Sequence, residues 1–213
     1  LVAVAISLAA LPALSRFFAA GDETSFRATL GRGLRTVLLL IMPATVGLFV
    51  LGQPVVELVF QRGAFLPSDT TAVVQALRIY LIGLIPASLD WLLNYTFYAR
   101  NDTKTPAFVG VASVGIYLLF ALPLVGRVGY LGLVLADSAK HTGHFVIMLI
   151  MLRRRLGSLN DLRGGITAGR TLVASAGMVL VLLLVIPLLR GTLPAGFEGN
   201  LLLVVVAMAL GGA

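Results

Sequence analysis

Six ionisable side chains lie inside long apolar stretches of this sequence, and these side chains are the best candidates for carrying chemistry. They are Arg78, Asp90, Asp137, Lys140, His141 and His144. In a stretch that crosses a membrane, a charged group is costly to desolvate and requires either a polar partner or a water-filled cavity. Ionisable residues at such positions therefore indicate a pathway for a substrate or an ion.

Four of these residues form one local cluster. Asp137 precedes Lys140 by three positions and His141 by four, so these side chains share one helical face, with His144 one turn further along. The cluster has three interpretations: a self-neutralising ion pair, a site for substrate or proton handling, and a metal site of Asp137, His141 and His144. No HExxH or comparable motif accompanies these residues, so we expect no metal and no other cofactor.

The composition argues against most soluble classes of protein. Of the 213 residues, 59% are hydrophobic and 12% are charged, and the mean hydropathy is +1.01, whereas soluble domains carry about 25% charged residues. The net charge of +7 comes from basic residues beside the apolar stretches, which favours contact with anionic membrane lipids and not with nucleic acid. The sequence has no cysteine, no phosphate-binding loop and no Gly-x-Ser-x-Gly motif, so we do not expect an enzyme.

The apolar stretches predict a polytopic membrane protein built from helices. About 20 apolar residues of helix cross a bilayer core, and stretches near this length recur along the chain. We predict five complete spans, at residues 36–51, 71–99, 106–125, 129–152 and 171–189, with a short amphipathic segment at 54–60. The stretches 1–14 and 201–213 are too short to span alone, so we expect both to be half-helices of a longer chain.

The basic residues in the loops test this assignment. Counted in order, the loops hold four, one, two, one, five and one Lys or Arg, with Arg62 alone in the second and Arg163 within the fifth. Because basic loops stay on the cytoplasmic side, the alternation places the first, third and fifth loops in the cytoplasm.

The first of these loops has a helical pattern of its own. Asp22 is a good helix cap, and Phe26, Leu30 and Leu34 recur at every fourth position after it. This pattern predicts either an amphipathic helix lying along the membrane surface or a lead-in to the next span, and the two are compatible.

Several longer segments carry a family resemblance. In order and spacing, LPALSRFFAAGDETSFRATLGRGLR at 11–35, PATVGLFVLGQPVVELVFQRGAF at 43–65, SDT at 68–70 and FYARNDTKTP at 97–106 resemble the second lobe of the MurJ (MviN) lipid II flippase family. GYLGLVLADSAKH at 129–141 and LRRRLG at 152–157 continue the match. The resemblance covers residues 1–157, and beyond them the chain matches only as generic membrane helices.

The resemblance implies an all-α fold with fourteen transmembrane helices, of the multidrug/oligosaccharidyl-lipid/polysaccharide exporter superfamily. Two six-helix lobes would surround a central cavity, followed by two extra C-terminal helices. Residues 1–157 would form the second-lobe bundle, beginning inside a truncated helix, and 158–213 a cytoplasmic loop and the extra helices, the last one truncated. The family's connection between the eighth and ninth helices is cytoplasmic, in agreement with the loop charges.

The implied activity is the flipping of lipid II, the undecaprenyl-pyrophosphate-linked peptidoglycan precursor, across the bacterial cytoplasmic membrane by alternating access. Its partners would be lipid II, membrane lipids and the missing N-terminal lobe, and Arg78 and Lys140 could supply positive charge. The family's best-known charged residues lie mostly outside this sequence, so none is carried over. Two alternatives remain: another exporter of the superfamily, for a polysaccharide-linked lipid or a drug, and a non-transporting membrane scaffold for cell-wall assembly.

Overall fold

The computed structural model describes residues 1–61, 63–157, 164–192 and 197–212, and within these ranges every regular element is an α-helix. Arg62, Arg163 and the start of the predicted second part, residues 158–163, lie outside the described residues. The helices are α1 (Val2–Ala19), α2 (Glu23–Phe60), α3 (Pro67–Ala99), α4 (Lys104–Val128), α5 (Tyr130–Leu156), α6 (Gly164–Thr192) and α7 (Phe197–Gly212).

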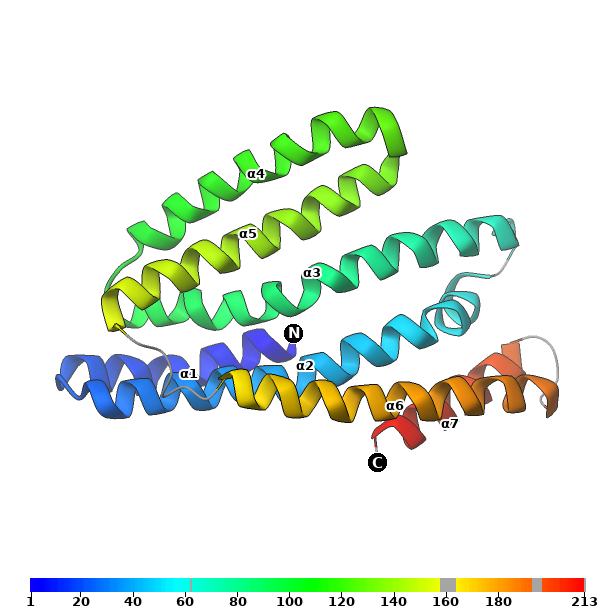
Figure 1. Ribbon diagram of the computed structural model, residues 1–213, viewed down its shortest axis with the longest axis horizontal. Helices are drawn as coiled ribbons and strands as arrows, with labels where there is room; N and C mark the ends of the chain where they lie inside the picture. The colour runs from blue at the N-terminus through cyan, green and yellow to red at the C-terminus, as the bar shows by residue number, and fades with distance from the viewer. Residues whose placement is uncertain (62, 158–163, 193–196, 213) are drawn as a thin grey trace.

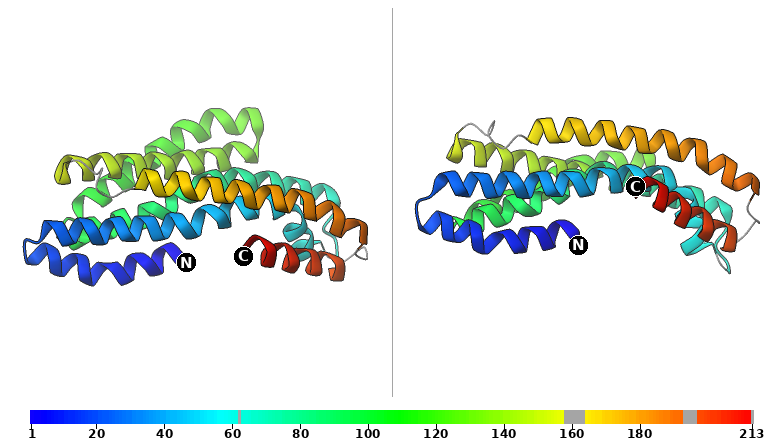
Figure 2. Two further views of the ribbon diagram at one scale, coloured as in Figure 1. Left: turned by 60° about the horizontal axis from the view of Figure 1, so that its bottom comes forward. Right: turned by 90° about the horizontal axis from the view of Figure 1, so that it is seen from below.

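The helices form one bundle in which neighbours run side by side. In Figure 1, α4, α5 and α3 follow one another from the top, α1 and α2 lie below them, and α6 and α7 lie along α2. Figure 2 shows that α1 accompanies the first half of α2, whereas α7 accompanies its second half. The long helix α2 therefore packs against different partners at its two ends.

Five of the described helices are long and apolar enough to cross a membrane, namely α1, α2, α3, α4 and α6. The prediction that the first stretch is too short to span alone is wrong, because α1 continues past it to 18 residues. By contrast, α5, which corresponds to the predicted span 129–152, is not among the five, since charged and imidazole side chains reduce its hydropathy.

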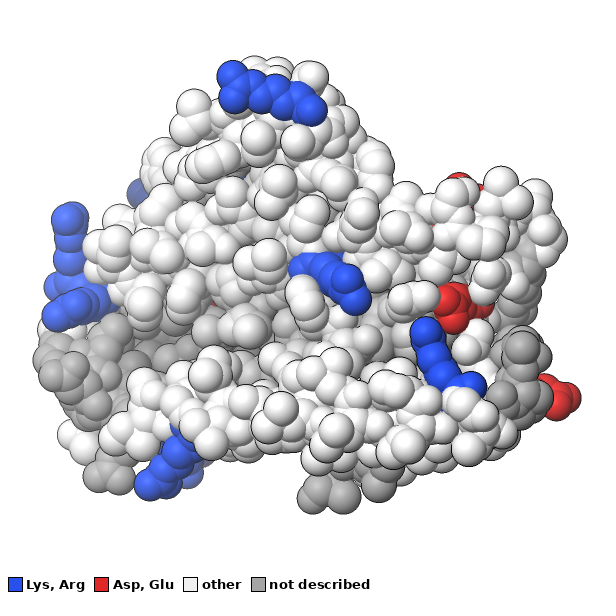
Figure 3. Space-filling model, turned by 45° about the vertical axis from the view of Figure 1, so that its right-hand side comes forward, with Lys and Arg blue, Asp and Glu red and all other residues white. Residues whose placement is uncertain are grey.

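Much of the surface is apolar, as a lipid-facing surface should be. The face drawn in Figure 3 is mostly uncharged, with a few basic groups and fewer acidic ones. The most exposed large apolar side chains on α4 and α6 are more than two-thirds exposed, and they include Phe108, Val111, Leu119, Leu122, Val173, Leu184 and Leu188. The two outermost helices thus present side chains suited to lipid.

The start of α2 corrects one prediction. Asp22 caps the helix as expected, since its carboxylate accepts a hydrogen bond of 2.9 Å from the Ser25 main-chain N–H. The apolar stripe, however, is buried in the protein: Phe26 and Leu30 have no exposed surface and Leu34 is 9% exposed. The prediction of a helix lying on the membrane surface is therefore wrong. The segment is the first part of one 38-residue helix that continues through Pro43 and Pro54.

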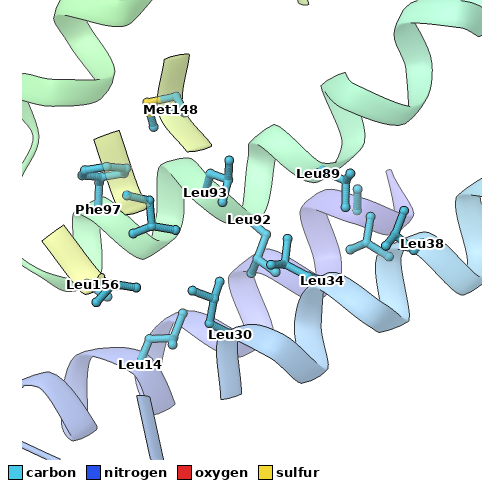
Figure 4. Close-up of a cluster of buried hydrophobic side chains, with 14 of the residues drawn as sticks. Leu14, Leu30, Leu34, Leu38, Leu89, Leu92, Leu93, Phe97, Met148 and Leu156 are labelled. Carbon is cyan, nitrogen blue, oxygen red and sulfur yellow. The ribbon is translucent and has the colours of Figure 1, made fainter. Parts of the chain in front are cut away.

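Two apolar cores hold the bundle together. The larger one joins α1, the first half of α2 and the second halves of α3 and α5, and Figure 4 shows Leu14, Leu30, Leu92 and Phe97 pointing into it. A smaller core joins α2, α6 and α7 through Leu51, Leu182, Leu203 and Ala207. Between membrane helices such contacts stabilise mainly through close van der Waals packing, so their fit matters more than their hydrophobicity.

Small residues bring α5 close to both of its neighbours. A Cβ atom added to Gly83 of α3 would lie 2.8 Å from Ser138 Cα of α5, and one added to Gly132 would lie 2.6 Å from the Leu124 main-chain carbon of α4. At the same place, the Ser138 hydroxyl donates a hydrogen bond of 2.9 Å to the Ile79 main-chain oxygen. Small residues and hydroxyl bonds of this kind let membrane helices approach closely.

The predicted cytoplasmic loops meet at one end of the bundle. Arg100, after α3, lies 3.5 Å from the Glu23 carboxylate at the start of α2. Arg155, at the end of α5, lies 2.6 Å from the Asp102 carboxylate, which also accepts hydrogen bonds from the Thr105 main-chain N–H and hydroxyl. Three loops assigned to the same side by their charge are therefore joined by ion pairs.

Gly83→Ala should destabilise the packing of α3 on α5, because the added methyl group would overlap the backbone at Ser138. We expect a loss of about 1–3 kcal/mol, typical of an overpacked contact. Thermal unfolding of the purified intact protein in lipid nanodiscs measures it. Gly115→Ala on α4 is the matched control, since its Cβ meets nothing within 4 Å; equal stability of the two variants would contradict the close approach.

Asp102 should stabilise the loop between α3 and α4 in a pH-dependent way. Partial burial raises the pKa of this carboxyl, but the Thr105 hydrogen bonds and the Arg155 charge together lower it below the usual 3.8. A lowered pKa means that the stabilisation is complete above the unfolded-state value and is lost as the pH falls through the lower, folded-state pKa. Asp102→Asn should therefore unfold at a lower temperature at pH 7, and the difference should shrink below about pH 3.8. A difference that stays constant with pH would argue against a role for the ionised Asp102 carboxylate.

Candidate functional site

A polar contact inside the bundle joins α3 to α5. His144 Nδ1 lies 2.8 Å from Asp90 Oδ1, and the two side chains are 13% and 14% exposed. Asn94, one turn after Asp90, donates from Nδ2 to Asp90 Oδ2 at 2.9 Å and to the Asp90 main-chain oxygen at 2.8 Å. Both oxygens of this nearly buried carboxylate are thus hydrogen-bonded, as a charged group away from water requires.

A second group of charges lies on α5 alone. Lys140 Nζ forms a hydrogen-bonded ion pair with Asp137 Oδ1, and His141 Nε2 lies 3.6 Å from Asp137 Oδ2. Lys140 Nζ also lies 6.0 Å from the centre of the Tyr117 ring on α4, a favourable position for a cation. The predicted meeting of these three α5 side chains on one face is confirmed.

This ion pair borders an open cavity between α3, α4 and α5. The cavity has a volume of about 440 Å³ and its lining residues are Tyr80, Val114, Tyr117, Leu133, Asp137 and Lys140. Lys140 and Asp137 keep 28% and 24% of their side-chain surface exposed. Each charge in this cavity already has its opposite beside it, so the pair has no net charge to offer a ligand.

Arg78 lies in a different cavity, of about 630 Å³, between α2, α3 and α6. Its guanidinium carbon lies 5.4 Å from the centre of the Phe49 ring. In the described part of the chain, no carboxylate lies within ion-pair distance of Arg78. The same cavity is lined by Thr45, which is 6% exposed and whose hydroxyl has no hydrogen-bond partner among the described residues. An arginine and a hydroxyl in an otherwise apolar cavity fit an anionic group on an apolar molecule.

The structure connects two residues that the sequence pattern does not bring together. Spacing along the chain places His144 with the α5 cluster and leaves Asp90 alone, whereas the structure pairs the two across helices. Asn94 was missed, although its position one turn after Asp90 is a detectable signal for a hydrogen bond. Among the described residues, no three His, Cys, Asp or Glu side chains come together as potential metal ligands, so the metal interpretation finds no support there.

A helical bundle with five apolar helices of spanning length and paired charges in its interior is a polytopic membrane protein. The chain belongs to the lipid II flippase MurJ family, because the family model described as "Lipid II flippase MurJ" matches residues 1–206. The match extends past residue 157, where the sequence analysis ended the resemblance, and it includes α6 and most of α7. This is a family of multi-pass proteins of the bacterial inner membrane.

Curated relatives and a solved structure agree with this assignment. Probable lipid II flippases MurJ from Vibrio cholerae and Haemophilus influenzae are each 36% identical, over 65% and 67% of this chain. A solved chain described as "Lipid II flippase MurJ, inward closed conformation" superposes with a TM-score of 0.72 and 21% identity over 98% of this chain, which supports the same fold. The chain spans 26% and 29% of the length of those two relatives, and 41% of the solved chain.

If Asp137 and Lys140 neutralise each other, removing one charge should lower the free energy of unfolding more than removing both charges does. Lys140→Met leaves Asp137 without its cation, and we expect a loss of about 1–3 kcal/mol, the usual cost of an unsatisfied buried group. Adding Asp137→Asn should restore most of that loss. Unfolding of the intact protein in nanodiscs measures both variants, and a double variant as unstable as Lys140→Met would mean that Lys140 acts independently of Asp137.

Proposed function

We propose that this chain is the second half of a flippase that moves lipid II from the inner to the outer leaflet of the bacterial cytoplasmic membrane. Residues 1–157 would form the second lobe, and 158–213 would form a cytoplasmic loop and the two additional C-terminal helices. Family membership over residues 1–206 supports the proposal, and so does the packing of α6 and α7 along α2, apart from the layer of α3, α4 and α5.

The physical task is to carry a pyrophosphate and sugars through hydrocarbon. Charged groups at membrane depth are costly, so a carrier must replace their water with polar and cationic side chains in a cavity. The polyprenyl tail can stay in contact with lipid throughout. Two lobes that open alternately to the two sides complete the cycle without forming or breaking a covalent bond. The protein would therefore be a transporter and not an enzyme, and it would need no cofactor.

Arg78 carries this proposal. Of the basic side chains lining the two cavities described above, Lys140 is neutralised by Asp137, whereas Arg78 has no carboxylate in ion-pair distance among the described residues. A guanidinium binds phosphate oxygens through a planar set of N–H donors, so Arg78 is suited to hold the pyrophosphate of a lipid whose tail lies on apolar walls.

The proposal also implies two other partners, the N-terminal lobe of the same chain and the membrane lipids. The second lobe encloses only one side of a central cavity, so the N-terminal lobe of the same chain would supply the opposite wall. Membrane lipids would surround the apolar faces of α4 and α6. The ion pairs at the basic end of the bundle, Arg100 with Glu23 and Arg155 with Asp102, would keep the cytoplasmic ends of the helices together while the lobes move.

Complementation tests the proposal. The full-length gene that encodes this chain is expressed in bacteria depleted of their own lipid II flippase, together with Arg78→Ala, Arg78→Lys and Arg127→Ala. We expect rescue by the parent and by Arg127→Ala, which removes an exposed arginine outside both cavities. Arg78→Ala should reduce flipping about tenfold or more, because an ionic hydrogen bond contributes about 1.5–3 kcal/mol, and Arg78→Lys should retain part of it.

Each outcome is read at equal membrane abundance of the variants. Full rescue by Arg78→Ala would remove Arg78 from the transport path. A well-expressed parent that fails to rescue would contradict the proposed substrate and favour either another lipid-linked substrate or a scaffold role. In the scaffold case, the paired charges on α5 would serve only to hold the bundle together.

A further inference from the structure

A group of exposed basic side chains lies where α4 begins and α5 ends. These two ends lie together in Figure 1, and the Arg155 guanidinium joins them by donating a hydrogen bond of 3.2 Å to the Thr105 hydroxyl. Lys104, Arg153 and Arg154 are exposed there, and we call them the basic triplet. In the described part of the chain, none of the three lies within ion-pair distance of a carboxylate.

Two carboxylates at this end of the bundle already have basic partners. Asp102 lies 2.6 Å from Arg155, and Glu23 lies 3.5 Å from Arg100. The basic triplet therefore adds three positive charges that these carboxylates do not balance. The loop charges place this end on the cytoplasmic side, where the anionic headgroups of the inner leaflet create a negative surface potential.

Exposed apolar side chains continue from the basic triplet towards the middle of the membrane. On α4, Phe108 and Val111 follow Lys104 by four and seven positions, so they share its face, and each is 74% exposed. On α5, Ile150 precedes the two arginines of the triplet by three and four positions and is 47% exposed. Seven residues of helix correspond to a depth of about 10 Å. Both helices thus carry positive charge at the cytoplasmic end and apolar side chains deeper in the membrane, which matches the headgroup and acyl chains of a phospholipid.

We propose that the basic triplet and the exposed faces of α4 and α5 beside it bind one anionic phospholipid of the inner leaflet. Its phosphate lies among the three basic groups, since arginine binds phosphate oxygens through a planar set of N–H donors and lysine binds them as a point charge. Its acyl chains lie along Phe108 and Ile150. A soluble anion would leave these apolar side chains uncovered, and a zwitterionic lipid would add no net negative charge, whereas an anionic phospholipid meets both requirements. The triplet lies outside both cavities, so the inference stands whether or not the protein moves lipid II.

Photochemical crosslinking of the intact full-length protein tests the site. Phe108→p-benzoylphenylalanine places a photoreactive group on the exposed face of α4, in nanodiscs that contain equal amounts of phosphatidylglycerol and phosphatidylcholine. Mass spectrometry of the adducts then gives the ratio of the two lipids at this position. We expect phosphatidylglycerol to exceed phosphatidylcholine about fivefold or more. Lys104→Gln, Arg153→Gln and Arg154→Gln should each reduce the excess by up to about fivefold, the effect of one basic residue near an anionic headgroup.

Arg170→Gln is the matched control. It removes an exposed basic residue on the same predicted side of the membrane, near the start of α6, which packs on α2 and α7. This variant should keep the lipid ratio of the parent. A loss as large as that of the triplet variants would mean that the protein attracts anionic lipid only through its overall charge, and the specific site would be refuted.

Two further results would overturn the proposal. One is an equal yield of the two lipid adducts in the parent, or an excess of phosphatidylglycerol that survives removal of all three basic side chains. The other is a parent that crosslinks to protein in place of lipid, because a protein segment would then cover this face. The nanodiscs contain no lipid II and the readout is not transport, so a failed complementation and a failed phospholipid site are distinguishable.

Discussion

Inside a bilayer the partners of charged groups must come from the protein, and the close packing of α3 on α5 provides them here. Gly83 and Ser138 allow this approach because neither carries a bulky side chain. The distance set there brings Asp90 within hydrogen-bonding reach of His144. A larger residue at Gly83 would push the helices apart, and the carboxylate would then lose its cross-helix partner as well as its packing.

The packing of α3 on α5 also explains how α5, despite its ionisable side chains, can lie within the bundle. Its ionisable side chains make it less apolar than the five helices of spanning length. Asp137 and Lys140 reduce this cost locally by pairing on one face, and His144 Nδ1 lies 2.8 Å from Asp90 Oδ1 of α3. The apolar side chains of α4 complete its surroundings. α5 therefore depends on its neighbours for its place in the membrane, whereas α4 and α6 are apolar enough to depend on lipid.

Contacts between neighbouring turns of one helix could be predicted from the sequence, whereas contacts between two helices could not. The helices at the five predicted spans, the Asp22 cap and the ion pair of Asp137 with Lys140 follow from local spacing and are present, although α5 is not among the five helices of spanning length. The pairing of Asp90 with His144 depends on the register of α3 against α5, which no local pattern encodes. The stripe of Phe26, Leu30 and Leu34 was correctly found to be apolar, but its period is the same whether it faces lipid or protein. Only the packing against α1 and α3 decides between the two.

The length of α2 has a mechanical consequence. A continuous helix of 38 residues is about 57 Å long, nearly twice the thickness of a bilayer core of about 30 Å. Its first half is fixed in the larger core with α1 and α3, and its second half in the smaller core with α6 and α7. The helix thus connects the two cores through one continuous element, and Pro43 and Pro54, each of which removes a main-chain hydrogen bond, are the positions at which it can bend.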